Sequence, residues 1–358
     1  MITGLLALAA TVSVSAVAAT PAAARPAGPG SSAVDAVAFS PDGTLLAAGY
    51  GDGAVRLWVT ATGTERGPAL RSGAGPVTAV AFSPDGATLA SAGADGTVRR
   101  WNPAKNVVIG SPLRAGTGVN GVAFSPDGTL LAGAGADGGV TLWNAATGQV
   151  SGPVLRLGSG AVTAVAFSPD GTLLAAAYGD GTIARWDPVT EKPAGPPLRA
   201  SSGVRGIAFS PDGEFLASAD ADGGVTVWTV GTGLPFGPVL RSGSGPVNAV
   251  AFSADSTVLA AAHGDGTIRL WNPARNVAIG PPLQAGTGVN GVAFGPGGKL
   301  ASAGANGAIK VWDTAGLRAG RSVRDWIILV AVVLALVLAA AAVTITTREV
   351  WPRNPGRT

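Results

Sequence analysis

The sequence predicts an all-β protein, a seven-bladed β-propeller of four-stranded antiparallel blades, followed by one C-terminal transmembrane helix. The first observation is a repeat: Phe-Ser-Pro-Asp-Gly, or a near copy, occurs seven times, each time with a tryptophan about nineteen residues later. The second is the spacing of the repeats, 42–43 residues, which is typical of propellers and other repeat arrays. The third is an almost unbroken apolar run over 326–347, which is long enough to cross a bilayer.

Residues 34–76 show how one repeat forms a blade. Alternating apolar residues over 34–39 predict a half-buried strand. The following Ser-Pro-Asp-Gly predicts a tight turn, because proline presets φ and glycine accepts the left-handed conformation. Small residues over 45–49 predict a second strand, which ends at the hairpin signal Asp52-Gly53. Residues 55–58 and 67–71 predict the third and fourth strands, and four antiparallel strands in ~43 residues make one blade.

Each repeat contributes one tryptophan, which we expect in the core with no role beyond packing. These residues are Trp58, Trp101, Trp143, Trp186, Trp228, Trp271 and Trp312.

Over 34–313 the chain resembles the WD-repeat β-propeller family. The resemblance rests on the runs V-x-x-V-A-F-S-P-D-G and D-G-x-V-x-x-W, and on the closing Trp-Asp pair at Trp186-Asp187 and Trp312-Asp313. It implies a propeller whose protein ligands often dock on one face. That face carries the loops before the first strand and the hairpins between strands two and three; we call it the hairpin face.

One feature of the resembled family is missing. Its members usually carry Gly-His before the first strand, and this His bonds the Asp of the hairpin; here the only histidine, His263, lies elsewhere in its repeat. The hairpin Asp persists in six repeats, with Asn306 in the seventh: Asp52, Asp95, Asp137, Asp180, Asp222 and Asp265. We expect side chains close to the missing His to pair with these aspartates instead: Arg71, Arg114, Arg156, Arg199, Arg241 and Gln284.

The seven blades must meet end to end, since otherwise two sheet faces stay uncovered. Blade seven therefore needs a fourth strand as well. In blades one to six a leucine twelve residues after the tryptophan marks this strand: Leu70, Leu113, Leu155, Leu198, Leu240 and Leu283. After Trp312 two candidates remain, a shortened hairpin over 316–320 or a return of the N-terminal segment 25–31. The first keeps a leucine and is preferred, and the propeller is therefore predicted over 34–320.

Both ends of the chain suggest a membrane. Trp326 and Trp351 bracket the apolar run 326–347 as an aromatic belt does, and 348–358 would form a short tail. Residues 1–24 read as a signal peptide or a weak N-terminal anchor, joined to the propeller by a linker over 25–33. The short apolar stretch and Pro21 favour a signal peptide, whereas the lack of Lys or Arg before the stretch weighs against it. We expect a single-pass protein of the cell membrane, in a bacterium, with the propeller outside.

Charge gives no indication of a nucleic-acid partner. The whole chain has a net charge of +3, but residues 34–313 hold 17 Lys and Arg against 19 Asp and Glu, a net charge of −2. The positive excess therefore lies in the tails, where arginines flank the apolar run near lipid headgroups. The absence of cysteine excludes structural disulfides and a lipid-anchored lipoprotein.

Patterns for catalysis, cofactors or metals are absent from the sequence. With one His and no Cys there is no Cys–His pair, and a metal site would depend on carboxylates alone. Asp220-Ala-Asp222 lacks the spacing of a calcium loop and is interpreted as a hairpin turn.

Candidate partner contacts lie on the hairpin face. Two residues before the hairpin Asp, where other repeats carry glycine, stand Tyr50, Tyr178, Asp220 and His263. Tyrosine is enriched at interface hot spots, although these side chains could equally fill the rim of the channel. A second ring opens the first strands, and Arg205 is its one cation: Asp35, Thr78, Asn120, Thr163, Arg205, Asn248 and Asn290.

The favoured function is a membrane-anchored, non-catalytic scaffold for a protein or peptide partner. The alternative is an envelope enzyme or small-ligand sensor that uses the central channel. A third possibility is a degraded paralogue of a larger signalling protein. Fold alone does not identify the partner.

Overall fold

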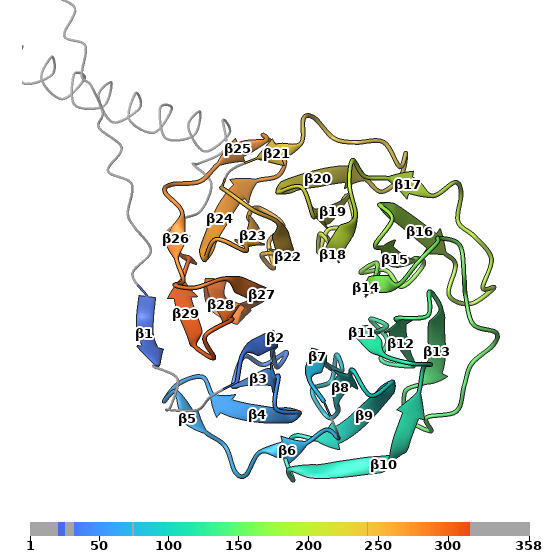
Figure 1. Ribbon diagram of the computed structural model, residues 1–358, viewed down its shortest axis with the longest axis vertical. Coiled ribbons are helices and arrows are strands. Elements are labelled where there is room, and N and C mark those ends of the chain that lie inside the picture. The colour runs from blue at the N-terminus through green and yellow to red at the C-terminus, as the bar shows by residue number, and fades with distance from the viewer. Residues whose placement is uncertain (1–20, 26–31, 74, 242, 316–358) are drawn as a thin grey trace, which may run out of the picture. The chain divides into compact units, whose positions relative to one another are not determined.

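The structure is a computed structural model that describes residues 21–25, 32–73, 75–241 and 243–315. These residues form a seven-bladed propeller around a central channel (Figure 1). The predicted all-β class, the number of blades and their four-stranded antiparallel build are confirmed.

In blades one to six the strands run from the channel outward in chain order, and in blade seven β27, β28 and β29 do so with β1 outermost (Figure 1). Blades one and two contain β2 (Val34–Phe39), β3 (Leu45–Tyr50), β4 (Ala54–Val59), β5 (Thr64–Glu65) and β6 (Leu70–Arg71), then β7 (Val77–Phe82), β8 (Leu89–Gly93), β9 (Thr97–Asn102) and β10 (Val107–Arg114). Blades three and four contain β11 (Val119–Phe124), β12 (Leu130–Gly135) and β13 (Val140–Asn144), then β14 (Val162–Phe167), β15 (Leu174–Tyr178), β16 (Thr182–Trp186) and β17 (Leu198–Arg199). Blades five and six contain β18 (Val204–Phe209), β19 (Phe215–Asp220), β20 (Gly224–Thr229) and β21 (Leu240–Arg241), then β22 (Val247–Phe252), β23 (Leu259–His263), β24 (Thr267–Asn272), β25 (Val277–Ala278) and β26 (Leu283–Gln284). Blade seven contains β27 (Val289–Gly295), the 3₁₀ turn η1 (Pro296–Gly298), β28 (Lys299–Gly304), β29 (Ile309–Asp313) and β1 (Pro21–Arg25).

The predicted leucines of the fourth strands take one register in blades one to six. Each pairs with the Val or Ile three residues after the hairpin Asp, as Leu70 does with Val55 and Leu198 with Ile183. In blade three the outer strand is reduced to isolated bridges, one of which joins Leu155 to Val140. All six leucines are buried, so one apolar side chain seals each of these outer strands.

Blade seven is closed by the N-terminal segment. β1 pairs antiparallel with β29, with Pro21 opposite Trp312 and Arg25 opposite Ile309. The N-terminal alternative supplies this strand, with residues 21–25 in place of 25–31, and the preferred prediction over 316–320 lies outside the described residues. β1 occupies the outer edge of β29, along which a fourth strand of this blade pairs.

Removing β1 tests this closure. We expect a chain without residues 1–25 to lose about 2 kcal/mol of unfolding free energy relative to a chain without residues 1–20, because three residue pairs of the outer ladder disappear. Thermal unfolding and protease sensitivity of the two chains measure the difference. Equal stability of both chains would contradict a closing role for β1.

The hydrophobic core is divided among the blade interfaces. The described residues form seven clusters, each built from two neighbouring blades, and each contains the tryptophan of the later blade. Six tryptophans are at most 7% exposed, and Trp58, between blades seven and one, is partly buried. The prediction of a core position is thus confirmed for six tryptophans and holds in part for Trp58.

The Ser-Pro-Asp-Gly turns lie at the opposite end of the blades from the hairpins. In blade one, Ser40 Oγ donates to Asp42 Oδ1 at 2.5 Å and the Thr44 amide donates to the same oxygen at 3.0 Å. Gly43 takes a φ of +69°, which glycine adopts without strain. The Ser40 hydroxyl and these turn contacts hold the pKa of Asp42 below its usual value, so the carboxylate is charged at neutral pH.

Both predicted membrane-related segments fall largely outside the described residues. Residues 326–347 and 348–358 are not described, nor are 1–20. Within the described part of the chain no helix is long and apolar enough to cross a membrane.

Candidate partner-binding face

Each hairpin of the hairpin face is held by the side-chain oxygen of its Asp or, in blade seven, of its Asn. Oδ1 of the hairpin Asp accepts the backbone N–H two residues later in blades one to six, at N–O distances of 2.8–3.2 Å. Asn306 Oδ1 accepts the Ala308 N–H in the same way at 3.1 Å. The glycine after this Asp or Asn is left-handed in all seven blades, with φ between +78° and +88°. The hairpin signal of the sequence therefore acts through this side-chain contact.

Serines take the place of the missing histidine in three blades. Ser159 Oγ donates to Asp180 Oδ2 at 2.7 Å, and Ser201 Oγ donates to Asp222 Oδ2 at 3.1 Å. The Ser244 amide donates to Asp265 Oδ2 at 3.1 Å. All three serines stand 21 residues before their aspartate; this spacing was the signal in the sequence that our interpretation missed.

The predicted pairing of arginines with the Asp ring occurs in two blades. Arg156 lies 2.7 Å from Asp137, and Arg241 lies 2.6 Å from Asp222. Arg199 instead donates to Thr182 Oγ1 at 2.5 Å. Among the described residues Arg71 and Arg114 have no ion-pair partner. The backbone oxygen of Gln284 accepts a hydrogen bond from Lys310 Nζ. The general prediction is therefore wrong outside blades three and five.

In blades one and two the hairpin Asp is approached from its own third strand instead. Arg56 lies 3.4 Å from Asp52, and Arg99 lies 3.8 Å from Asp95. Both pairs span four residues within one hairpin, so they reach the carboxylate by a shorter path than Arg71 or Arg114.

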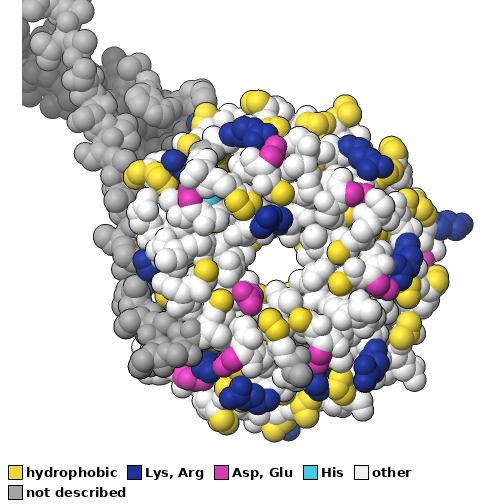
Figure 2. Space-filling view, viewed as in Figure 1, with side chains coloured by type: hydrophobic (Ala, Val, Ile, Leu, Met, Phe, Trp, Pro, Cys, Tyr) yellow, Lys and Arg dark blue, Asp and Glu magenta, His cyan; other side chains and the backbone are white. Residues whose placement is uncertain are grey.

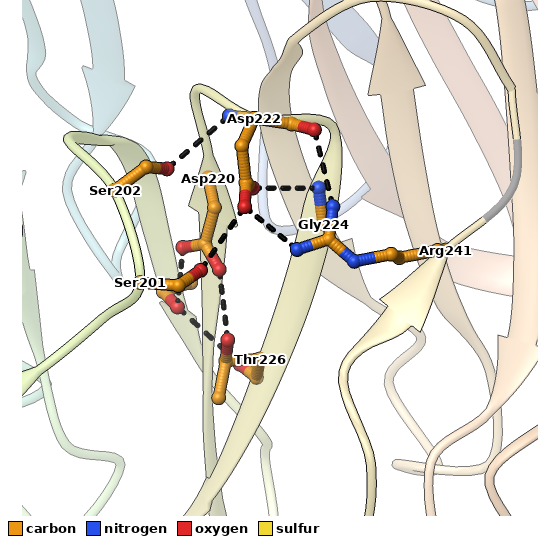
Figure 3. A network of polar contacts seen from close by, with 8 residues as sticks. Ser201, Ser202, Asp220, Asp222, Gly224, Thr226 and Arg241 are labelled. Carbon is orange, nitrogen blue, oxygen red and sulfur yellow. Dashed lines mark hydrogen bonds and ion pairs between the residues drawn. The ribbon is translucent and has the colours of Figure 1, made fainter.

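Blade five holds a buried carboxylate beside an exposed one (Figure 3). Asp220 is fully buried at the end of β19, where its Oδ1 accepts from Ser218 Oγ at 2.9 Å and its Oδ2 from Thr226 Oγ1 at 2.8 Å. Burial raises the pKa of Asp220 to about 6. Hydrogen bonding to Arg241 lowers the pKa of the neighbouring Asp222. The interpretation of this Asp-Ala-Asp run as a hairpin turn agrees with the bond from the Gly223 amide to the Asp220 carbonyl.

The other predicted contact residues at this position are also buried. Tyr50, Tyr178 and His263 are 4%, 0% and 1% exposed. The Leu157 amide donates to the Tyr178 hydroxyl oxygen at 3.3 Å, and the guanidinium of Arg56 lies over the ring of Tyr50 at 4.7 Å. Burial lowers the pKa of His263. Such burial leaves little of these side chains accessible to a partner, and it favours the alternative that they fill the rim of the channel.

The second predicted ring joins neighbouring blades along the channel. Five of its side chains donate to the backbone oxygen of the residue that opens the next blade: Thr78 to Val119, Asn120 to Val162, Thr163 to Val204, Asn248 to Val289 and Asn290 to Val34. Arg205 is exposed and donates to Asn248 Oδ1 at 2.9 Å. Asp35 accepts from Asn290 Nδ2 at 3.2 Å. The ring thus links blade seven to blade one, and partner binding by Arg205 stays a prediction.

Comparison with known protein families identifies the family of this propeller. Residues 33–313 match the family described as the first β-propeller of IFT122, and this match covers most of the chain. The chain belongs to the IFT122 first β-propeller family. The match supports the WD-repeat type of propeller inferred from the repeats. No curated protein matches the chain.

Two buried arginines of this IFT122-type propeller were not predicted. Arg100 and Arg185 directly precede the tryptophans of blades two and four and are 4% and 8% exposed. Arg100 NH1 donates to the carbonyls of Ala145 and Ala146 in the next blade, at 2.7 and 2.9 Å. Arg185 NH1 donates to the carbonyl of Val230 at 3.1 Å. Each arginine ties the third strand of one blade to the outer turn of the next.

Replacing Arg100 separates the contribution of its hydrogen bonds from that of its volume. Arg100→Ala should lower the unfolding free energy by about 2 kcal/mol, since it leaves two carbonyls without a donor and opens a cavity. Arg100→Leu should cost less, because it fills the site and removes a buried charge, and leucine occupies the same position in blade six as Leu270. Urea unfolding of both variants measures this order. A greater loss for leucine would contradict it.

Proposed function

We propose that the chain is a membrane-anchored, non-catalytic scaffold that binds a protein or peptide partner through the hairpin face. Membership of the IFT122 first β-propeller family supports a role in protein interaction. The observation that carries the proposal is that the strands pack the blades together, whereas the fourth-strand arginines stay exposed around this face. Figure 2 shows Lys and Arg side chains spaced around the rim of the propeller, several beside an Asp or Glu.

We propose the membrane anchor from the sequence, with the propeller on the outer side of the membrane. The apolar run 326–347 has the length of a membrane span, and the short segment before Pro21 has the character of a signal peptide. Reporter fusions after Asp313 and after Thr358 test this topology. Alkaline phosphatase activity at Asp313 alone agrees with an outward-facing propeller; cytoplasmic reporter activity at Asp313 overturns it.

A photo-crosslinking residue tests which face binds the partner. Placed at Arg71 on the hairpin face of the full-length protein, in intact cells, it should yield a discrete crosslinked product. The matched control is Ala87, an exposed residue of the Ser-Pro-Asp-Gly turn at the opposite end of blade two. Products from Ala87 alone, or from neither position, would contradict binding at the hairpin face.

A further inference from the structure

One sector of the hairpin face carries more cations than carboxylates. Blades one, two and seven adjoin one another and carry five cations beside their hairpins, which we call the cationic arc: Arg56, Arg71, Arg99, Arg114 and Lys310. Arg71 and Arg114 are exposed, and the side chains of Arg56 and Arg99 are 27% and 22% exposed.

Carboxylates in this sector do not balance the arginines and lysine. The described carboxylates in this sector are Asp52, Asp95, Glu65 and Asp35, four against five cations. Their ion pairs are long, at 3.4 Å for Arg56 with Asp52, 4.0 Å for Arg56 with Glu65 and 3.8 Å for Arg99 with Asp95. Blade seven has Asn306 where the other blades have the hairpin Asp, which removes one more negative charge from the same sector.

The opposite sector, blades three to five, is balanced. There the hairpin Asp and the fourth-strand Arg occur once per blade, and in blades three and five they form short pairs of 2.7 and 2.6 Å. Blade five adds one further charge of each sign, the buried carboxylate of Asp220 and the exposed guanidinium of Arg205. The two sectors therefore differ at the third-strand position four residues after the hairpin Asp or Asn, which is Arg56, Arg99 and Lys310 in the cationic arc and Thr141, Ala184 and Thr226 in blades three to five.

We infer that the partner segment recognised by the scaffold is acidic, a run of Asp and Glu side chains that docks along the cationic arc. This inference deepens the proposed function and rests on it. Exposed guanidinium groups offer several N–H donors in a planar fork that matches carboxylate geometry. Arg71 and Arg114 form no ion pair with any described carboxylate, so an incoming acidic side chain gains contacts without breaking a pair in this part of the chain. Each exposed pair contributes little by itself, and binding therefore depends on several pairs acting together.

A labelled octaglutamate peptide tests this chemistry. We expect it to bind the full-length protein in detergent micelles by fluorescence anisotropy, and an octaglutamine peptide of the same length to bind at least tenfold more weakly. Raising the ionic strength from about 0.05 to about 0.5 M shortens the Debye length from about 14 to about 4 Å and should weaken the octaglutamate complex. Equal binding of the two peptides would overturn the inference.

Charge-neutral substitutions locate the site. The double variant Arg71→Gln/Arg114→Gln should weaken octaglutamate binding about tenfold, since two surface pairs are lost. The matched control Arg156→Gln/Arg241→Gln changes the same structural positions in blades three and five, and should change binding by less than about twofold, because those arginines already pair with aspartates. A loss as large in the control, or none in the first variant, would overturn the assignment to the cationic arc.

The two proposals fail in distinguishable ways. If a crosslinker at Arg71 captures a partner in cells while octaglutamate does not bind, the scaffold function is supported and the inference of an acidic partner segment is contradicted. If octaglutamate binds at the arc while no crosslinked product forms in cells, the chemistry of the surface stands and the scaffold function loses its support. Thermal unfolding of each variant shows whether the fold is intact before either result is interpreted.

Discussion

Replacing Trp143 with alanine should lower the unfolding free energy by about 3–5 kcal/mol, the range for deleting a large aromatic side chain from a core. Trp143 is 1% exposed and lies in the cluster between blades two and three. Its ring leaves no space for a side chain at Gly133, where an added Cβ would lie 2.8 Å from the ring. The indole therefore fills a volume that neighbouring side chains cannot reach, and its removal leaves a cavity.

Trp58 provides the control, because it holds the same position in its blade and is only partly buried. Trp58→Ala should cost less than Trp143→Ala when both are measured by denaturant unfolding monitored by circular dichroism. Equal losses would show that the tryptophans contribute through something other than the depth of burial in their interface.

Asp220→Asn should stabilise the protein above about pH 6 and abolish most of the pH dependence that this carboxyl causes. The folded-state pKa of Asp220, about 6, lies above the ordinary value of about 3.9, so the folded state holds the proton more tightly than the unfolded state. This contribution to stability is fully present below about pH 4 and is lost as the pH rises through about 6. A shift of about two pKa units corresponds to about 3 kcal/mol. Asparagine stays neutral throughout, and its amide can still accept from Ser218 and donate to the Thr226 hydroxyl.

Unfolding free energies of the two proteins between pH 4 and 8 measure this effect. Asp222→Asn is the control with the opposite sign, since hydrogen bonding to Arg241 lowers the pKa of Asp222 and its contribution is lost as the pH falls. Asp222→Asn should therefore destabilise the protein at neutral pH. An Asp220→Asn variant that is less stable than the parent at pH 8 would contradict a raised pKa of the buried Asp220.

Local chemistry explains why most of the blade could be predicted. The Asp52-Gly53 hairpin, the turn at Asp42 and the outer leucine Leu70 each act within a few residues or with one neighbouring strand, and their signals recur in nearly every repeat. A residue whose environment lies inside its own blade can be interpreted from the repeat alone.

Contacts between distant segments could not be predicted in this way. β1 closes blade seven by backbone pairing, and its Pro-Ala-Ala-Ala-Arg sequence resembles no other outer strand. Arg100 reaches a turn 45 residues later, and Tyr178 lies under a loop that begins about twenty residues before it. Pairing of arginine with the hairpin Asp also depends on how far each side chain can reach, which the spacing in the sequence does not express.

The division of the core among blade interfaces has a consequence for connectivity. No blade encloses a core of its own, so a blade excised from the chain would expose both of its faces, as isolated solenoid repeats do. The seven interfaces of the closed ring do not depend on which blade comes first in the chain. A circular permutant that joins residue 315 to residue 21 through a short linker and opens the chain in the loop between blades three and four should retain every interface. Two fragments divided in that loop should likewise reassemble by complementation.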